Sequence, residues 1–166
     1  MADNILFDVE GYEALTPAIL DLLNQYPGLE EGKSFSFSKL SERGGLAMFP
    51  NTGAVINTQR ISVIGKVYQE CVYPFFVYYR AGGLSESRKV SLKEWLDNLG
   101  RWLERQPVKI GDETFTLENY PELTQDRKII YFQRQSPAYL EGISEDKIED
   151  WVIAINLRYS NSFTRR

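Results

Sequence analysis

The side chains that most often carry chemistry are scarce in this sequence, which contains no histidine. Histidine is the usual general base and the commonest metal ligand, and it activates the nucleophile in Ser-His and Cys-His pairs. The one cysteine, Cys71, lies in an apolar aromatic run without a neighbouring base, a setting that favours a buried, unreactive thiol. Most hydrolase mechanisms therefore lack one of their parts in this chain.

Paired carboxylates are the remaining groups that could catalyse a reaction or hold a cation. They occur at Glu30-Glu31, at Asp112-Glu113 and in a cluster of Glu145, Asp146, Glu149 and Asp150. Each group lies in a segment expected to be exposed, and the cluster lacks the alternating Asx and glycine pattern of a calcium loop. We interpret them as solvated surface and predict no catalytic residue, no metal ligand, no cofactor site and no enzymatic activity.

Phosphate and nucleic-acid binding are not indicated either. The glycines occur as Gly44-Gly45, Gly82-Gly83 and the isolated Gly65, without the spacing of a phosphate-binding loop, and are interpreted as turns. Tyr73, Phe75 and Tyr79 could form an RNA-binding platform, but basic residues are sparse around them. With a net charge of −4, the chain has no global basic surface, and no sequence-specific nucleic-acid partner is predicted.

Length and composition predict one domain over residues 1–166, with its core at about 10–160. The chain is 43% hydrophobic and 13% aromatic, which supplies a core and can supply subunit interfaces. A single cysteine excludes an intrachain disulfide and favours synthesis in the cytoplasm. No stretch reaches the ~18 apolar residues of a membrane span, so no membrane partner is expected.

Two helices are predicted by apolar residues at three- and four-residue spacing. The first lies within residues 9–26, and its secure part is 16–25, with Thr16 as N-cap and Pro17 at the first helical position. The second covers residues 91–106. Ser91 and Glu94 there form a capping box, and Pro107 ends the helix.

Strands are predicted by the alternation of apolar residues and by β-branched runs. They are a short strand at Phe35 and Phe37, and residues 46–49, 54–64 with a turn near Gly65-Lys66, 67–80, 128–134 and 151–159. The pattern weakens over residues 107–126, where a turn is predicted at Gly111-Asp112 and the segment 114–123 is predicted to leave the core. Residues 136–150 are predicted to form a long acidic loop. The order of these elements predicts an α+β fold, with a mainly antiparallel sheet and two helices packed on one face.

The run at residues 67–80 is apolar on both faces, although Pro74 removes one sheet donor and would suit an edge or a bulge. Two short helices on one face would leave part of this aromatic surface uncovered, and uncovered apolar patches usually mark interaction sites. The residues predicted to lie at a subunit interface are Tyr73, Phe75, Phe76, Tyr78 and Tyr139.

The aromatic run at 73–80, the polar linker after it, and the helix with Trp95-Leu96 and Trp102-Leu103 together resemble a known family. The likeness continues through Pro137-Ala138-Tyr139-Leu140 to the strand at 151–159, so that it spans roughly residues 10–160. The sequence resembles the tail-terminator and minor-capsid (neck) proteins of siphophages and of prophages of Gram-positive bacteria.

This resemblance implies a structural virion protein, made in the cytoplasm of the bacterial host, whose copies form a ring with a hexamer as the expected stoichiometry. Its implied partners are further copies of itself, the tail tube protein and the head connector proteins. Two other classes remain open. One is a non-enzymatic adaptor or binding module that is monomeric or dimeric, and the other is an enzyme that holds two carboxylates in a deep pocket.

Overall fold

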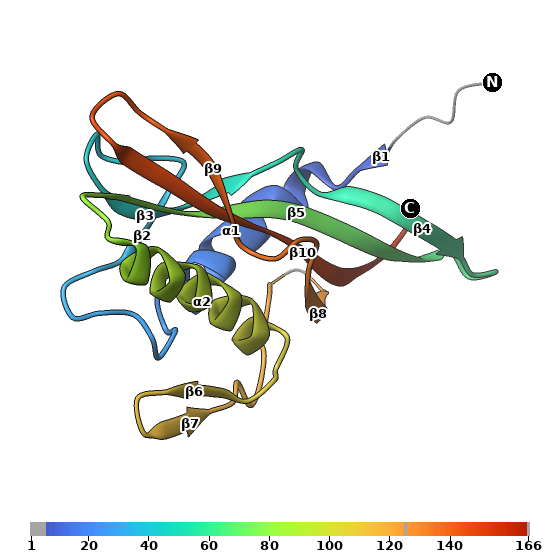
Figure 1. Cartoon of the computed structure of the whole chain (residues 1–166). Coiled ribbons are helices and arrows are strands. Elements are labelled where there is room, and N and C mark those ends of the chain that lie inside the picture. The colour runs from blue at the N-terminus through green and yellow to red at the C-terminus, as the bar shows by residue number, and fades with distance from the viewer. Residues whose placement is uncertain (1–5, 125, 166) are drawn as a thin grey trace.

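The computed structural model describes residues 6–124 and 126–165, which form a mainly antiparallel eight-stranded sheet with two helices (Figure 1). The helices are α1 (Val9–Leu23) and α2 (Glu86–Leu103). The sheet contains β1 (Leu6–Phe7), β2 (Phe35–Phe37), β3 (Gly45–Pro50), β4 (Val55–Ile61), β5 (Lys66–Gly82), β8 (Arg127–Arg134), β9 (Tyr139–Ile143) and β10 (Ile148–Thr164). A separate hairpin of β6 (Val108–Ile110) and β7 (Glu113–Phe115) lies off this sheet, with the turn predicted at Gly111-Asp112. The predicted departure of 114–123 from the core is wrong, because Phe115, Leu117 and Tyr120 pack against it. The predicted α+β class is confirmed.

The centre of the sheet is the antiparallel pair of β5 and β10, each 17 residues long. They pair without interruption from Lys66 opposite Thr164 to Gly82 opposite Ile148. On the far side of β5 lie β3 and β4, and on the far side of β10 lie β8 and β9. Only β2 pairs in parallel, with β3. Every strand of the sheet is therefore attached directly or through one neighbour to the β5–β10 pair.

Pro74 lies in this central strand, and the pairing explains why it is tolerated there. One edge of β5 is shared by two strands, since β4 pairs with residues 67–72 and β3 with residues 75–80. The Pro74 carbonyl accepts a hydrogen bond from the Asn51 amide (3.0 Å), in the connection between β3 and β4. The missing Pro74 N–H therefore faces the gap between the two partner strands, where its loss breaks no ladder.

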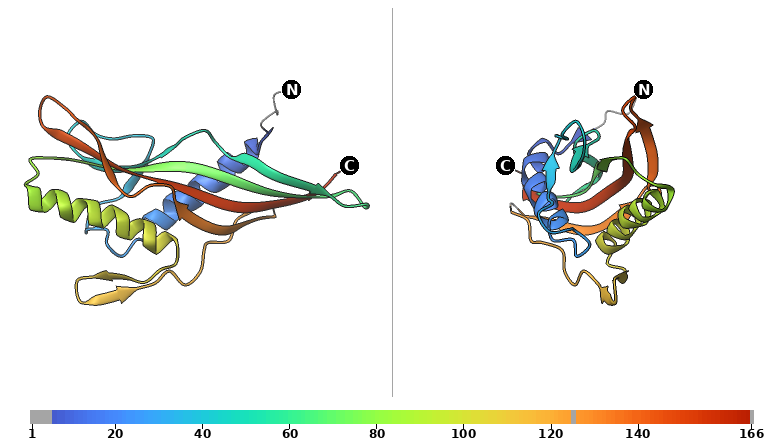
Figure 2. Two further views of the ribbon diagram at one scale, coloured as in Figure 1. Left: turned by 45° about the vertical axis from the view of Figure 1, so that its right-hand side comes forward. Right: turned by 60° about the vertical axis from the view of Figure 1, so that its left-hand side comes forward.

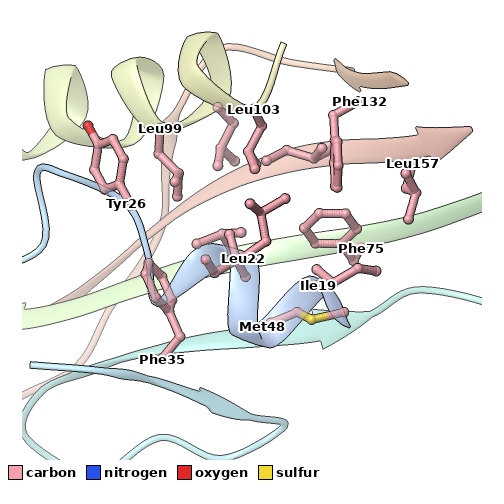
Figure 3. Close-up of a cluster of buried hydrophobic side chains, with 14 of the residues drawn as sticks. Ile19, Leu22, Tyr26, Phe35, Met48, Phe75, Leu99, Leu103, Phe132 and Leu157 are labelled. Carbon is pink, nitrogen blue, oxygen red and sulfur yellow. The ribbon is translucent and has the colours of Figure 1, made fainter. Parts of the chain in front are cut away.

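Both helices pack on the same face of β5 and β10, and the core lies between them and the sheet (Figures 2 and 3). From α1, the Thr16 hydroxyl is hydrogen-bonded to the Tyr73 hydroxyl (3.0 Å). From α2, Trp95 makes an edge contact with Tyr79 at 5.2 Å between ring centroids. The fully buried large side chains include Leu15, Ile19, Leu22, Met48, Phe75, Leu96, Leu99, Leu103, Phe132 and Tyr159.

The start of α1 differs from the prediction that Thr16 caps it. The helix begins at Val9 because the Asp8 side chain caps it, accepting the Gly11 amide at 3.1 Å. Pro17 lies inside the helix on its exposed side. Pro17 has no backbone N–H, so the helix lacks one hydrogen bond there. Tertiary packing of the rest of α1 offsets this loss, and that packing cannot be read from the local sequence.

The start of α2 also lies earlier than the predicted Ser91. Ser85 is the N-cap and accepts the Arg88 amide at 3.3 Å, whereas the Ser91 hydroxyl lies inside the helix and donates to the Ser87 carbonyl at 3.1 Å. Ser85 and Ser91 could each serve as the N-cap. Because β5 ends at Gly82, the helix begins soon after it and Ser85 takes this position. The helix ends at Leu103, not at the predicted Gln106.

The segment predicted as a long loop, 136–150, contains β9, which returns along β10 as a hairpin. All five residues of β9 are exposed, so they show no apolar alternation that could reveal the strand. Its backbone hydrogen bonds to the edge of β10 hold it extended instead. The prediction of an irregular connection is therefore wrong for residues 139–143, and also for 148–150, which begin β10.

We predict that Trp102→Ala lowers the free energy of unfolding by about 3–5 kcal/mol, as other large-to-small core changes do. Trp102 is 4% exposed and its ring lies 5.5 Å from that of Tyr26, so truncation leaves a cavity between α2 and the end of α1. Urea denaturation followed by circular dichroism measures the change. The exposed neighbour Arg101→Ala is the control, and equal midpoints for the two variants would contradict the prediction.

Candidate functional site

The most concentrated set of polar side chains in the core surrounds the Asp8 carboxylate. Arg127 donates to it through Nε (3.0 Å) and Nη2 (2.7 Å), and the Tyr159 hydroxyl donates at 2.6 Å. The Gly11 amide is a further donor. These groups come from the cap of α1, from β8 and from β10, so the cluster ties the start of the first helix to two strands of the sheet.

The electrostatics of the cluster describe a satisfied ion pair. Burial alone would raise the pKa of Asp8, but the hydrogen bonds from Arg127 and Tyr159 outweigh it and hold the pKa below its ordinary 3.8. Burial also raises the pKa of the nearby Cys71 thiol to about 11. Cys71 is fully buried, as predicted, and its thiol is protonated at neutral pH. The cluster fastens the fold and supplies no activated nucleophile.

We predict that Asp8→Asn destabilises the protein by about 3–5 kcal/mol at neutral pH, because it removes the carboxylate that binds the buried Arg127 guanidinium at 2.7 Å. A carboxyl whose pKa is lowered in the folded state stabilises fully above its unfolded pKa and loses that contribution as the pH falls through the folded pKa. The difference between wild type and variant should therefore shrink in strongly acidic solution.

Thermal unfolding measured from neutral pH down to below pH 3.8 tests this dependence. Glu13→Gln, at an exposed carboxylate of the same helix, is the matched control and should stay within about 0.5 kcal/mol of wild type. A difference between wild type and Asp8→Asn that is small at neutral pH, or that grows on acidification, would contradict the assignment.

The carboxylates singled out in the sequence do not converge. Glu30 and Glu31, Asp112 and Glu113, and Glu145 and Asp146 are exposed at separate places, and within the described ranges no group of three or more Asp, Glu, Cys or His side chains could hold a metal ion. The other two members of the acidic cluster are ion-paired. Glu149 is buried with Lys89 Nζ at 3.4 Å, and Asp150 binds Arg80 at 2.6 and 2.9 Å.

The five predicted interface residues divide between the two faces of the sheet, and for two of them the prediction is wrong. Tyr73 and Phe75 are 0% and 1% exposed on the face that the helices cover. Figure 3 shows Phe75 among Ile19, Phe132 and Leu157. Neither ring can meet another subunit, and neither can serve as the RNA-binding platform considered above.

The other three predicted residues, Phe76, Tyr78 and Tyr139, share the opposite face of the sheet. Tyr78 is flanked across the strands by Ala47 and Val152, and Val152 in turn by Tyr139. Its ring contacts those of Phe49 (5.1 Å) and Phe76 (6.3 Å). We call Phe49, Phe76, Tyr78, Tyr139 and Ala154 the outer aromatic patch, whereas Ala47 and Val152 between them are 0% exposed.

No described helix covers the outer aromatic patch, and its aromatic rings are partly exposed, Tyr139 at 42%. Burial and the neighbouring Glu141 carboxylate raise the pKa of the Tyr78 hydroxyl, which keeps that group neutral at physiological pH. The patch therefore offers partly exposed aromatic area with the neutral hydroxyl group of Tyr78, a composition common at protein interfaces.

A second surface, which the sequence prediction missed, lies at the tip of the β4–β5 hairpin. Val63 and Ile64 in the turn are 108% and 84% exposed, and Ile61, Tyr68 and Phe163 on the adjoining strands are also exposed. Cations surround these apolar groups. Arg60 and Lys66 lie over the Tyr68 ring, at 5.2 and 5.4 Å from its centroid, and Arg165 adjoins the turn.

We call residues 60–68 with Phe163 and Arg165 the basic tip. Its conformation is fixed by local hydrogen bonds, because the Ser62 amide donates to the Lys66 carbonyl (2.8 Å) and the Lys66 amide donates to the Ser62 hydroxyl (3.0 Å). Gly65 takes a φ of +84° that a glycine adopts without strain. The apolar pair Val63-Ile64 before Gly65 was the signal available in the sequence, since turns are ordinarily polar.

Comparison with known proteins adds no family to these observations. No protein-family model matches the sequence, and no curated protein matches it. Neither helix in the described part of the chain has the length and apolar character that crossing a membrane requires. The surfaces of the molecule and the sequence resemblance therefore carry the functional proposal.

Proposed function

We propose that this protein is a structural subunit of a siphophage virion, a tail-terminator-like protein whose copies form a ring that caps the tail tube and joins it to the head connector. The observation that carries the proposal is the outer aromatic patch. It lies on a sheet face that no described helix covers, while the other face holds a complete core. A subunit of a virion assembly needs such an apolar surface for its protein partners.

The sequence resemblance over residues 10–160 supports the same function, because its aromatic strand is β5, its helix is α2 and its final strand is β10. These elements form the centre of the molecule and one of its two covering helices. The segments that carry the resemblance thus include the two central strands of the sheet, on whose outer face the outer aromatic patch lies.

The net charge of −4 fits a ring through which a genome passes. A channel lined by acidic subunits repels the phosphate backbone within about a Debye length, roughly 8–10 Å at physiological salt, whereas a basic channel would retain DNA. The ring would therefore be joined to protein partners through apolar and aromatic contacts and would leave DNA unbound. In this proposal the protein is synthesised in the host cytoplasm. It then forms the ring and binds the tail tube protein and the head connector proteins in the virion.

We predict that the purified protein forms rings at the ends of purified tail tubes of the cognate phage, seen by negative-stain electron microscopy. The double variant Phe76→Ser/Tyr139→Ser should weaken this capping about 30-fold or more, because truncating an aromatic anchor at an interface commonly costs about 2 kcal/mol or more. Val90→Ser, an exposed apolar position on α2, is the control and should cap normally.

Light scattering on the isolated protein distinguishes the alternative. A chain that stays monomeric or dimeric at high concentration and also leaves tail tubes uncapped would contradict the proposal and favour a non-enzymatic adaptor. If the patch variant caps tail tubes as well as wild type does, the outer aromatic patch takes no part in capping.

A further inference from the structure

The two ends of the β5–β10 pair carry opposite charges. Because β10 is 17 residues long and pairs with β5 throughout, its two ends lie roughly 55 Å apart. One end holds the basic tip, and the other holds the hairpin of β9 and β10, as the left view of Figure 2 shows. The stiff central ribbon keeps the two ends apart, so they cannot meet within one molecule.

The basic tip presents a small apolar knob among cations. Val63 and Ile64 are exposed in the turn, while Arg60 and Lys66 on the adjoining strands lie over the Tyr68 ring. No acidic residue occurs in positions 51–69 or 159–166 of the sequence. Aliphatic side chains this exposed gain no burial within the single chain. A partner that covered them would bury their apolar surface.

The opposite end presents a pocket of about 370 Å³ with matching chemistry. Ile143 and Ile148 supply aliphatic walls, and the carboxylate of Glu42 lines the same pocket. Arg80 and Asp150 also line it and are paired with each other at 2.6 and 2.9 Å, so Glu42 leaves the pocket with one net negative charge. Glu141, Glu145 and Asp146 are exposed on the same hairpin, against a single cation at Lys147. We call the β9–β10 hairpin with this pocket the acidic end.

We infer that copies of this protein join head to tail, with the basic tip of one copy docked in the pocket at the acidic end of the next. The apolar knob fits the aliphatic walls, and its flanking cations face Glu42 and the exposed carboxylates of the β9–β10 hairpin. This inference rests on the proposed function, for which it names the contact between neighbours. A contact between two different surfaces of one chain is heterologous, and it closes into a ring when its rotation permits.

The test uses two variants of the full chain, each of which disables one end. Val63→Asp/Ile64→Asp disables the basic tip, and Glu145→Lys/Asp146→Lys disables the acidic end. All four positions are exposed, so the fold should be unaffected, which circular dichroism verifies. Asp112→Lys/Glu113→Lys on the distant β6–β7 hairpin is the charge-matched control.

Light scattering coupled to size exclusion at low salt should show wild type and the control forming oligomers whose mass rises with concentration. Each end variant alone should remain monomeric. A mixture of the two should give a one-to-one dimer and nothing larger, because each partner keeps one working end. Added salt should dissociate that dimer, since its charged contact is screened.

Several results would overturn the inference. They are wild type that is monomeric at every concentration, end variants that associate like wild type, and end variants that fail to complement each other. Binding of the tip to a duplex oligonucleotide or to vesicles containing phosphatidylserine, without self-association, would assign it to a different partner.

Capping of purified tail tubes by wild type and by the two end variants tests the proposed function separately. If wild type and both end variants cap tubes equally, the head-to-tail contact is wrong while the proposed function stands. If the two end variants complement each other in solution but wild type leaves tubes uncapped, the contact stands and the proposed function is wrong.

Discussion

The uninterrupted pairing of β5 with β10 is the constraint on which the rest of this structure depends. Four further strands attach to the outer edges of this pair, and both helices pack against one face of it. The inward side chains of the two strands form the floor of the core, from Cys71 towards one end to Trp151 near the other. Disrupting their register by one residue would exchange the buried and the outward rings.

The helices cover only part of this long ribbon, and the two exposed surfaces follow from that geometry. Where α1 and α2 pack, the inner face is dry. Beyond the first turn of α1 the ribbon continues to the basic tip, where Ile61 and Phe163 are exposed although they point to the same face as the core. The Asp8–Arg127 ion pair marks the boundary, since it fixes the start of α1 against β8.

The distribution of charge gives the molecule a direction. Cations gather at one end of the ribbon and carboxylates at the other, and each set accompanies exposed aliphatic groups. Ion pairs on a protein surface contribute little by themselves, and their larger effect is to select partners and orientation. In the proposed assembly, apolar burial supplies most of the affinity, while the opposite charges at the two ends favour head-to-tail over head-to-head contact.

Local pattern in the sequence determined the class of the fold and most of its elements. The faultless alternation from Trp151 to Tyr159 identified β10, and the apolar stripe with Trp95 and Trp102 identified α2. Alternation alone, however, states that a strand has two faces and not which face the helices will cover. For this reason Tyr73 and Phe76, neighbours in one aromatic run, were predicted as one interface although only Phe76 faces outward.

The tertiary structure decided what depends on contacts between distant residues. Asp8 displaced Thr16 as the cap of α1 because it is held by Arg127 and Tyr159, which follow it by more than a hundred positions in the chain. Likewise β9 is a strand because the edge of β10 pairs with it. The sequence by itself determined which segments could be helix or strand and the balance of charge, because periodicity and composition are local. Which face of the sheet the helices cover, and how far apart the charged ends lie, depend on the long pairing of β5 with β10 and could be known only from the folded structure.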